Sequence, residues 1–488
     1  MVFFYFKSEI NIFMIEKNNI LKNWLYLMSS DIFNKAIMFF VFILLARKLS
    51  VTDFGLFNVF IAIGSIFAVF ANFGTNLVIT REIALDNKHT SGLFFKFLPI
   101  RLFFLLVSIF FIVLYSSYES NSNLILIATI FFVISNSLWD FSESIAFGNY
   151  ITKYSSLYNV IFGIILLCLI VLVPENKVSL FSLVSIYVGT LFVRALFYFV
   201  TILKKYVYSS VKEEYMGKIT SIKTIKLSLP YVWIRTIGIF TDQVPILILN
   251  AQHGSKEVAL YSIALKLLTP IKMVVNTAAK AIFPFLAKWH ENDNTLFKKK
   301  VIIGYEVTLI LSIVVTLSLV LTSSVWLPEL FGQEYIHAVQ IFNILAWFAI
   351  IVTLDIYIST VLSSTSNQKL ISIIATVDAL IMIPSYLYFS KYGALILSYV
   401  QLSLGVILLI YHIIVLNNAL KLNLNKLWFS VNILPLLGLI SVTTLLHDNL
   451  VRFYCASIII IAYYFIENSP LRSSYMLILN TIKRRDDV

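Results

Sequence analysis

The sequence predicts an all-α integral membrane protein with 14 transmembrane helices: two six-helix lobes around a central cavity, plus two C-terminal helices. Three observations predict this fold: the composition, the length of the apolar runs and the distribution of basic residues between connections. Of 488 residues, 59% are hydrophobic and 13% are charged, whereas soluble domains carry about 25% charged residues. The composition therefore excludes a soluble enzyme, a disulfide-rich secreted scaffold and a disordered chain.

Fourteen apolar runs, bounded by clusters of Lys, Asn, Asp, Gly or Pro, provide the predicted helices. A membrane-spanning helix needs about 20 apolar residues, whereas a strand of a membrane barrel needs about 10 alternating ones. The runs are unbroken and of the helical length, so helices are expected. The runs lie near 24–47, 54–79, 93–115, 123–148, 154–173, 179–203, 224–250, 257–283, 300–322, 335–363, 369–389, 392–416, 427–446 and 450–467.

The ends and the cysteines add little to this organisation. The first twenty residues are hydrophobic only in patches and lack a small-residue cleavage site, so we expect an amphipathic cytoplasmic lead-in and no cleaved signal peptide. The two cysteines, Cys168 and Cys455, both lie in apolar runs. Neither a disulfide framework nor a zinc site is therefore expected, and no metal site is predicted elsewhere.

Basic residues predict the orientation of the chain. If the N-terminus is cytoplasmic, 25 Lys and Arg residues fall on the cytoplasmic side, among them Lys96 and Arg101, and six fall on the other side. Cytoplasmic connections of membrane proteins carry the excess of Lys and Arg. The bias predicts that both termini are cytoplasmic, and it explains the net charge of +12 without nucleic-acid binding.

The connections are too short for a separate catalytic domain. The longest, around 204–223, is roughly 20 residues, and the sequence has no Gly-x-x-x-x-Gly-Lys-Ser/Thr phosphate-binding loop. We therefore expect the protein not to be an enzyme and to do its work inside the membrane.

Two similar helix starts predict a repeat. Residues 49–57 and 254–261 share an order of small, acidic, apolar and aromatic residues at an offset of 204. An even number of spans in each half places the pseudo-twofold axis along the membrane normal, as in transporters whose halves move around a central site. The predicted organisation is an N-lobe of six helices, a basic cytoplasmic linker, a C-lobe of six helices, and two further helices with a basic tail, over 1–204, 205–226, 227–420 and 421–488.

Basic side chains inside the predicted helices indicate a hydrated interior. Each central Arg or Lys costs roughly 2.5–3.5 kcal/mol to insert, so such residues are expected to line a wet cavity or to form pairs. On one straight helix, Lys266, Lys272 and Lys280 lie at about 0°, 240° and 320°, within an arc of about 120°. Together they form a predicted cationic path for an anionic passenger such as phosphate or pyrophosphate: Arg194, Arg235, Lys266, Lys272 and Lys280.

Five carboxylates also lie within the predicted helices: Asp140, Glu143, Asp242, Asp355 and Asp378. Each could bind a coupling proton or sodium ion, or could pair structurally or line a wet cavity. Asp242 lies seven residues from Arg235 and hence nearly on the same helix face, and it could pair with that residue. Asp355 and Asp378 have no cation near them in sequence, so either could titrate during transport. His412 is expected to be a packed helix residue.

Several short motifs resemble those of a known family. In the first half these are LARKL, DFGLF, FG and REIA, at 45–49, 53–57, 73–74 and 81–84. In the second half they are EVALYSIA, IFPFL and LFGQEY, at 257–264, 282–286 and 330–335. In this order and spacing, over roughly 24–370, they resemble the Wzx-type O-antigen flippases of polysaccharide biosynthesis.

The resemblance implies the fold of the multidrug/oligosaccharidyl-lipid/polysaccharide exporter superfamily in the bacterial cytoplasmic (inner) membrane. The implied activity is movement of a polyprenyl-pyrophosphate-linked oligosaccharide, an O-antigen or capsule unit, to the outer leaflet by alternating access. Implied partners are membrane lipids, a polysaccharide polymerase and a chain-length regulator, with no nucleic acid. No cofactor is expected beyond H⁺ or Na⁺ coupling. An ion-coupled multidrug exporter and a lipid II flippase remain alternatives.

Overall fold

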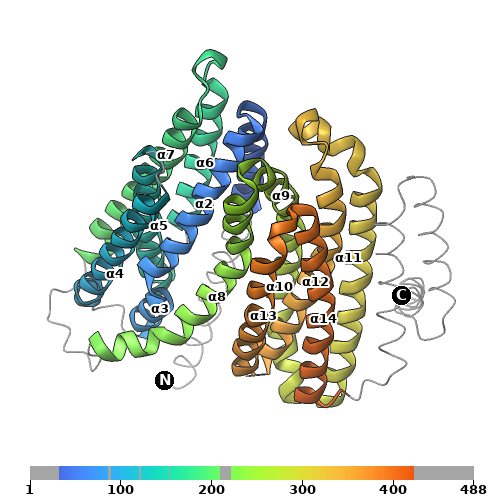
Figure 1. Ribbon diagram of the computed structural model, residues 1–488. Helices are drawn as coiled ribbons and strands as arrows, with labels where there is room; N and C mark the ends of the chain where they lie inside the picture. The colour runs from blue at the N-terminus through green and yellow to red at the C-terminus, as the bar shows by residue number, and fades with distance from the viewer. Residues whose placement is uncertain are drawn as a thin grey trace, which may run out of the picture. The chain divides into compact units, whose positions relative to one another are not determined.

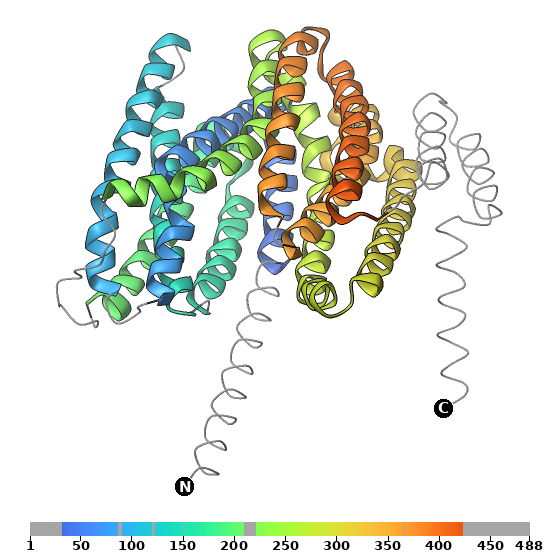
Figure 2. The same cartoon turned by 90° about the horizontal axis from the view of Figure 1, so that it is seen from below.

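The computed structural model describes residues 32–85, 90–119, 123–151, 153–208, 221–365 and 367–422, and these ranges are helical (Figure 1, Figure 2). The first helix in the described part covers 32–48. The others are α2 (Val51–Asn72), α3 (Thr75–Leu85), α4 (Thr90–Glu119), α5 (Asn123–Gly148), α6 (Lys153–Leu172), α7 (Leu180–Ile202), α8 (Ser221–His253), α9 (Ser255–Leu267), α10 (Thr269–Asn292), α11 (Asn294–Phe331), α12 (Ala338–Ser364), α13 (Gln368–Phe389) and α14 (Ala394–Leu420).

The helices confirm the all-α membrane fold. Within the described ranges, 11 helical segments are long and apolar enough to cross a membrane, and they match the predicted runs from 54–79 to 392–416. The predicted run 24–47 is described only from residue 32. The first twenty residues and the runs at 427–446 and 450–467 lie outside the described residues, so the total of fourteen stays a prediction.

The chain divides into two compact units, and the division along the sequence falls between Leu247 and Ile248. In the first unit, α5 is the central helix and packs against α2, α3, α4 and α7. In the second unit, α12 takes that place and packs against α9, α10, α11, α13 and α14. The predicted boundaries of the linker and of the C-terminal segment stay predictions.

The order of helices repeats between the units. α2 begins at Val51 and α9 at Ser255, an offset of 204 residues, and α4 and α11 begin at Thr90 and Asn294, which is the same offset. Helices α5, α6 and α7 precede α12, α13 and α14 by 215, 215 and 214 residues. The two central helices, α5 and α12, are therefore equivalent.

Two interruptions modify the predicted helices. α2 ends at Asn72 because Phe73 and Gly74 both have positive φ, 42° and 58°, which an α-helix cannot contain. The predicted helix 257–283 is interrupted at Leu268, where Pro270 provides no N–H for the helical ladder. The angles expected for Lys266, Lys272 and Lys280 assume one straight helix, and they stay a prediction.

Candidate functional site

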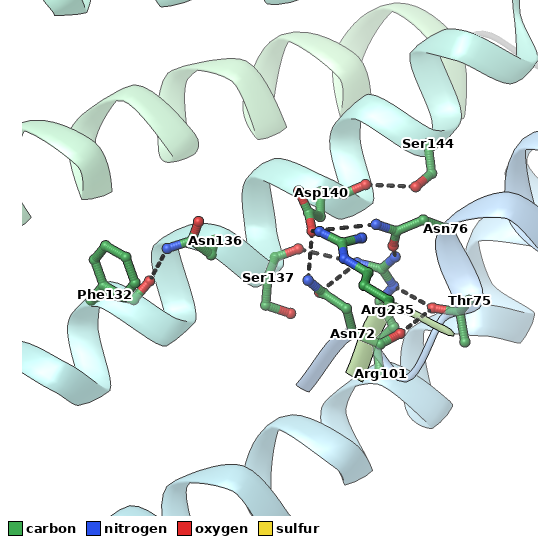
Figure 3. A network of polar contacts seen from close by, with 10 residues as sticks. All are labelled: Asn72, Thr75, Asn76, Arg101, Phe132, Asn136, Ser137, Asp140, Ser144 and Arg235. Carbon is green, nitrogen blue, oxygen red and sulfur yellow. Dashed lines mark hydrogen bonds and ion pairs between the residues drawn. The ribbon is translucent and has the colours of Figure 1, made fainter. Parts of the chain in front are cut away.

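A polar cluster lies inside the membrane-spanning part of the first unit (Figure 3). It joins the end of α2, the start of α3 and the middle of α4, α5 and α8. Its hydrogen-bonded members are Asn72, Thr75, Asn76, Arg101, Ser137, Asp140 and Arg235.

Arg101 is the buried centre of this cluster and only 3% of its surface is exposed. Its Nε donates to Oγ1 of Thr75 at 3.0 Å, and Nη1 donates to Oδ1 of Asn72 and to the carbonyl of Ser137 at 3.3 and 3.2 Å. Nη2 donates to Oδ1 of Asn76. Four partners on three helices offset the cost of burying a guanidinium, because a buried charge must be hydrogen-bonded.

Asp140 is the anion of the cluster. Its Oδ2 accepts hydrogen bonds from Nδ2 of Asn72 at 2.6 Å and of Asn76 at 3.3 Å, and it forms an ion pair with Nη2 of Arg235 at 3.3 Å. The side chain of Asp140 is 16% exposed, whereas that of Arg235 is 46% exposed. One carboxylate thus faces two guanidiniums, and the outer guanidinium remains accessible.

The break between α2 and α3 places the two asparagines. Because the chain turns through Phe73 and Gly74, Asn72 and Asn76 both face Asp140 and Arg101. Thr75 stabilises the turn by donating to the carbonyl of Asn72 at 2.7 Å. A Cβ at Gly74 would lie 2.8 Å from the backbone nitrogen of Val232, so glycine allows α8 to approach this turn.

Arg194 lies on α7 in the same unit. Its Nη1 donates to Oδ1 of Asn159 at 3.0 Å, and its guanidinium carbon lies 4.2 Å from the ring centre of Trp139, a cation–π contact. Glu143 and Asp140 also interact with it electrostatically. The structure thus brings together four of the predicted site residues, Arg194, Arg235, Asp140 and Glu143.

The second unit contains a different polar group. Nε2 of His412 on α14 lies 2.9 Å from Oδ1 of Asp378 on α13, within a hydrogen bond. Nδ1 lies 3.0 Å from Oδ1 of Asp355 on α12, at an angle outside that of a hydrogen bond. The ring of His412 is 4% exposed, and the Asp378 and Asp355 side chains are 21% and 37% exposed. Two predicted carboxylates therefore meet around one histidine.

The remaining predicted residues are more dispersed. In the first unit, Asp242 is exposed on α8, and Arg235 pairs with Asp140 (Figure 3). In the second unit, Lys266 is exposed at the end of α9, and Lys272 is half-buried on α10. The side chain of Lys280, also on α10, lies outside the described residues. The cationic path through all five basic residues therefore stays a prediction.

The sequence does not predict the roles of two members of these clusters. Arg101 was counted among the cytoplasmic basic residues, but it lies inside α4, in the spanning segment Thr90–Tyr115. Its position inside the predicted run 93–115 was the signal that could have identified it. His412 packs as expected, but it also joins Asp355 and Asp378. Those carboxylates are 57 and 34 residues away in sequence, so local spacing gave no signal.

Comparison with known proteins identifies the family and the fold. The family model described as polysaccharide biosynthesis protein matches residues 20–290. The structure is similar to a lipid II flippase MurJ in an inward closed conformation, with a TM-score of 0.66 and 17% identity over 91% of this chain and 98% of that chain.

A second similar structure is an inward-facing multidrug resistance MATE family transporter of the MOP superfamily, with a TM-score of 0.61 and 13% identity over 81% of this chain and 96% of that chain. A MOP superfamily transporter from Pyrococcus furiosus has a TM-score of 0.53 at 12% identity, over 83% of this chain and 96% of that chain. No curated protein matches the sequence. The chain belongs to the polysaccharide biosynthesis protein family, and it has the multi-helix membrane fold of these transporter structures.

Proposed function

We propose that this protein is a flippase that moves a polyprenyl-pyrophosphate-linked oligosaccharide from the cytoplasmic to the outer leaflet by alternating access. The membrane is the bacterial cytoplasmic membrane, and both termini are cytoplasmic. The cargo is an O-antigen or capsule repeat unit, which a polysaccharide polymerase with its chain-length regulator then consumes. The family assignment supports an oligosaccharide cargo, and the similarity to a lipid II flippase supports a cargo attached to a lipid.

One observation carries the choice of an anionic cargo: the polar cluster of the first unit has more positive than negative charge. The carboxylate of Asp140 pairs with Arg235 and interacts electrostatically with Arg101, so these three side chains carry a net charge of +1. A guanidinium binds phosphate oxygens through two parallel hydrogen bonds. Because Arg235 is half-exposed, it can bind a diphosphate while Arg101 holds the two asparagines, which in turn donate to Asp140.

The alternative of a cationic drug is less compatible with this charge. A multidrug exporter would bind cations more readily at an acidic site, whereas a cation brought to Arg235 would be repelled by the excess positive charge. Coupling to H⁺ or Na⁺ is part of the proposal, and no cofactor is included. A lipid II flippase remains the alternative that the same cluster would suit, because its cargo also carries a diphosphate.

The test is the replacement of Arg235 by Gln in cells that depend on this protein for surface glycan. Removal of a charged partner of the cargo is expected to cost about 1.5–3 kcal/mol, which is roughly ten- to hundredfold in export. Lipid-linked repeat units should accumulate on the inner leaflet while the protein level in the membrane is unchanged. Arg235→Lys should retain part of the activity, and Arg235→Gln combined with Lys272→Gln should abolish it.

The control is Arg81→Gln, which removes a guanidinium that is 68% exposed and pairs with its neighbour Glu82. It should leave export unchanged. Normal surface glycan in the Arg235→Gln and Lys272→Gln double variant would refute the proposed cargo site. Accumulation of lipid II, with normal levels of glycan repeat units, would identify the alternative cargo.

A further inference from the structure

The side chains of the second unit contain a proton site that the proposed cargo does not explain. His412 lies between two carboxylates that come from different helices, Asp355 from α12 and Asp378 from α13. Each carboxylate oxygen is within 3.0 Å of one ring nitrogen. A neutral imidazole has one N–H and one lone pair, so it can donate to only one of the two carboxylates.

The proton count follows from this geometry. With one proton on the ring and both carboxylates ionised, the three groups carry a charge of −2, and the lone pair of one ring nitrogen faces a carboxylate oxygen at about 3 Å. That state is repulsive inside a membrane-spanning bundle. With a second proton on the ring, Nε2 donates to Asp378 and the protonated Nδ1 forms an ion pair with Asp355, and the charge of the three groups changes from −2 to −1. The contacts with both carboxylates are therefore those of the doubly protonated ring.

Among the residues that the structure describes, Asp355 and Asp378 are the charged groups that act on the His412 ring. α14 packs against α9, α12, α13 and the short helix Ser390–Tyr392. Asp355 is the single acid of α12, and Asp378 is the single acid of α13. On α9, Glu257 accepts from the backbone nitrogen of Ala394, Tyr261 donates to Gln401, and Lys266 is exposed.

The remaining charged and phenolic groups of these elements lie near the helix ends or bond elsewhere. Lys369 is the second residue of α13, and Lys391 stacks on Tyr388 and Tyr392. On α14 itself, Tyr411 meets the His412 ring edge to face, with centroids 5.8 Å apart. The other phenols on these helices are Tyr357, Tyr386 and Tyr399.

The arrangement suits a proton better than a metal ion. The two ring nitrogens point in opposite directions, so the two carboxylates cannot converge with the ring on one ion. Accordingly, no group of three His, Cys, Asp or Glu side chains within the described ranges has the geometry of a metal site. Asp355 is more exposed than its partners, so a proton that enters or leaves the group is expected to pass it.

We propose that His412, Asp355 and Asp378 form a proton-binding site that joins α12, α13 and α14, and that loss of its proton releases α12 from the other two helices. In that step the Nδ1–H bond of His412 breaks, its electron pair stays on the ring, and the proton passes to water by way of Asp355. The charge of the three groups changes from −1 to −2. Asp378 keeps its hydrogen bond from Nε2 in both states.

Use of this proton to drive transport rests on the proposed function, but its binding does not. The test is therefore ¹⁵N-histidine NMR of the full-length protein in lipid nanodiscs without cargo, from pH 5 to 9. The chain has six histidines, and the signal of His412 is identified by its loss in His412→Gln. In the wild-type protein we expect Nδ1 to be protonated at the acidic end and to lose its proton within the range.

The matched variant is Asp355→Asn, whose amide can donate to Nδ1 and so removes the need for the second proton. We expect Nδ1 to be unprotonated throughout the range in this variant, while the signals of His253 and His337 remain unchanged. An Nδ1 that is unprotonated at every pH in the wild-type protein would overturn the proposal. Because the measurement uses no cargo, failure of the flippase assignment would leave this result unaffected.

Discussion

Asp140 and Asp355 occupy the same place in the two units but have different partners. Asp140 is the 18th residue of α5, which begins at Asn123, and Asp355 is the 18th residue of α12, which begins at Ala338. In the first unit the carboxylate pairs with the guanidinium of Arg235 and lies beside that of Arg101. In the second unit the carboxylate faces the imidazole of His412.

This difference separates a fixed charge from a variable one. A guanidinium stays charged at any pH that a cell experiences, so Arg101 and Arg235 keep their charge throughout a transport cycle. An imidazole gains and loses its proton within that range. The same carboxylate position therefore serves a permanent cationic site in one unit and a proton-dependent bridge in the other.

The largest effect is expected from removing the buried guanidinium of the first cluster, that of Arg101. Arg101→Ala removes the donor of four hydrogen bonds, to Thr75, the two asparagines and the carbonyl of Ser137, and each buried group left unsatisfied costs about 1–3 kcal/mol. The midpoint of thermal unfolding in detergent should fall accordingly, with Arg81→Gln as the exposed control. A midpoint that is unchanged in Arg101→Ala would show that the cluster does not stabilise the first unit.

A second comparison concerns the glycines at positive φ in the two units. Gly74→Ala should be destabilised both by the left-handed backbone, about 1–2 kcal/mol, and by overpacking, about 1–3 kcal/mol, because the new Cβ meets the backbone of Val232 at 2.8 Å. At Gly254, φ is 78°, ψ is 178° and nothing lies within 4 Å, so Gly254→Ala should incur only the cost of a backbone region that glycine alone adopts readily, about 1–3 kcal/mol. A loss of stability in Gly74→Ala no larger than its backbone cost of about 1–2 kcal/mol would contradict the close approach of α8.

Exchanging the partner of Asp355 should make the second unit resemble the first. His412→Arg places a permanent charge between the two carboxylates. With one exchangeable proton, the ratio of protonated to unprotonated His412 changes by at most about tenfold per pH unit. Export in the wild-type protein should therefore change by no more than about tenfold per pH unit. Surface glycan compared at pH 6 and pH 8 should lose this dependence in His412→Arg. A variant that follows the wild-type profile would separate the proton site from transport.

The smallest effect concerns a helix start. Oδ1 of Asp293 accepts hydrogen bonds from the hydroxyl and amide of Thr295 and from the amide of Leu296. The Thr295 hydroxyl first, and then the amides, lower the pKa of the Asp293 carboxyl. In the first unit, the neutral hydroxyl of Ser50 caps α2.

A lowered pKa in the folded state stabilises the start of α11 above the pKa of the unfolded chain, and this contribution is lost as pH falls through the folded value. Hydrogen exchange of residues 294–300 should therefore increase between pH 5 and pH 3, after correction for intrinsic rates, and the start of α2 should not respond. Asp293→Ser should remove the dependence on pH. Identical profiles at both helix starts in the wild-type protein would contradict the charged cap.

The sequence predicted the helices well because each run must satisfy its own backbone hydrogen bonds in lipid, and length and hydropathy suffice to locate such runs. It also identified Asp140, Glu143, Arg194 and Arg235 as candidates, because charges are rare within apolar runs. It missed the pairing of Arg235 with Asp140, 95 residues away, since partners on distant helices leave no local pattern. The proline-dependent interruption at Leu268 was missed because the apolar run continues through it.

The position of Arg101 has a consequence for how the protein is made. Three of its hydrogen-bond partners, Asn72, Thr75 and Asn76, precede it in the chain, so they are already synthesised when α4 leaves the ribosome. The neutral amides and hydroxyl can therefore receive the guanidinium during insertion, before Ser137 and Asp140 emerge. Asn72→Leu and Asn76→Leu would leave it without these early partners, and the defect would be visible as failed integration of α4 rather than as lost activity.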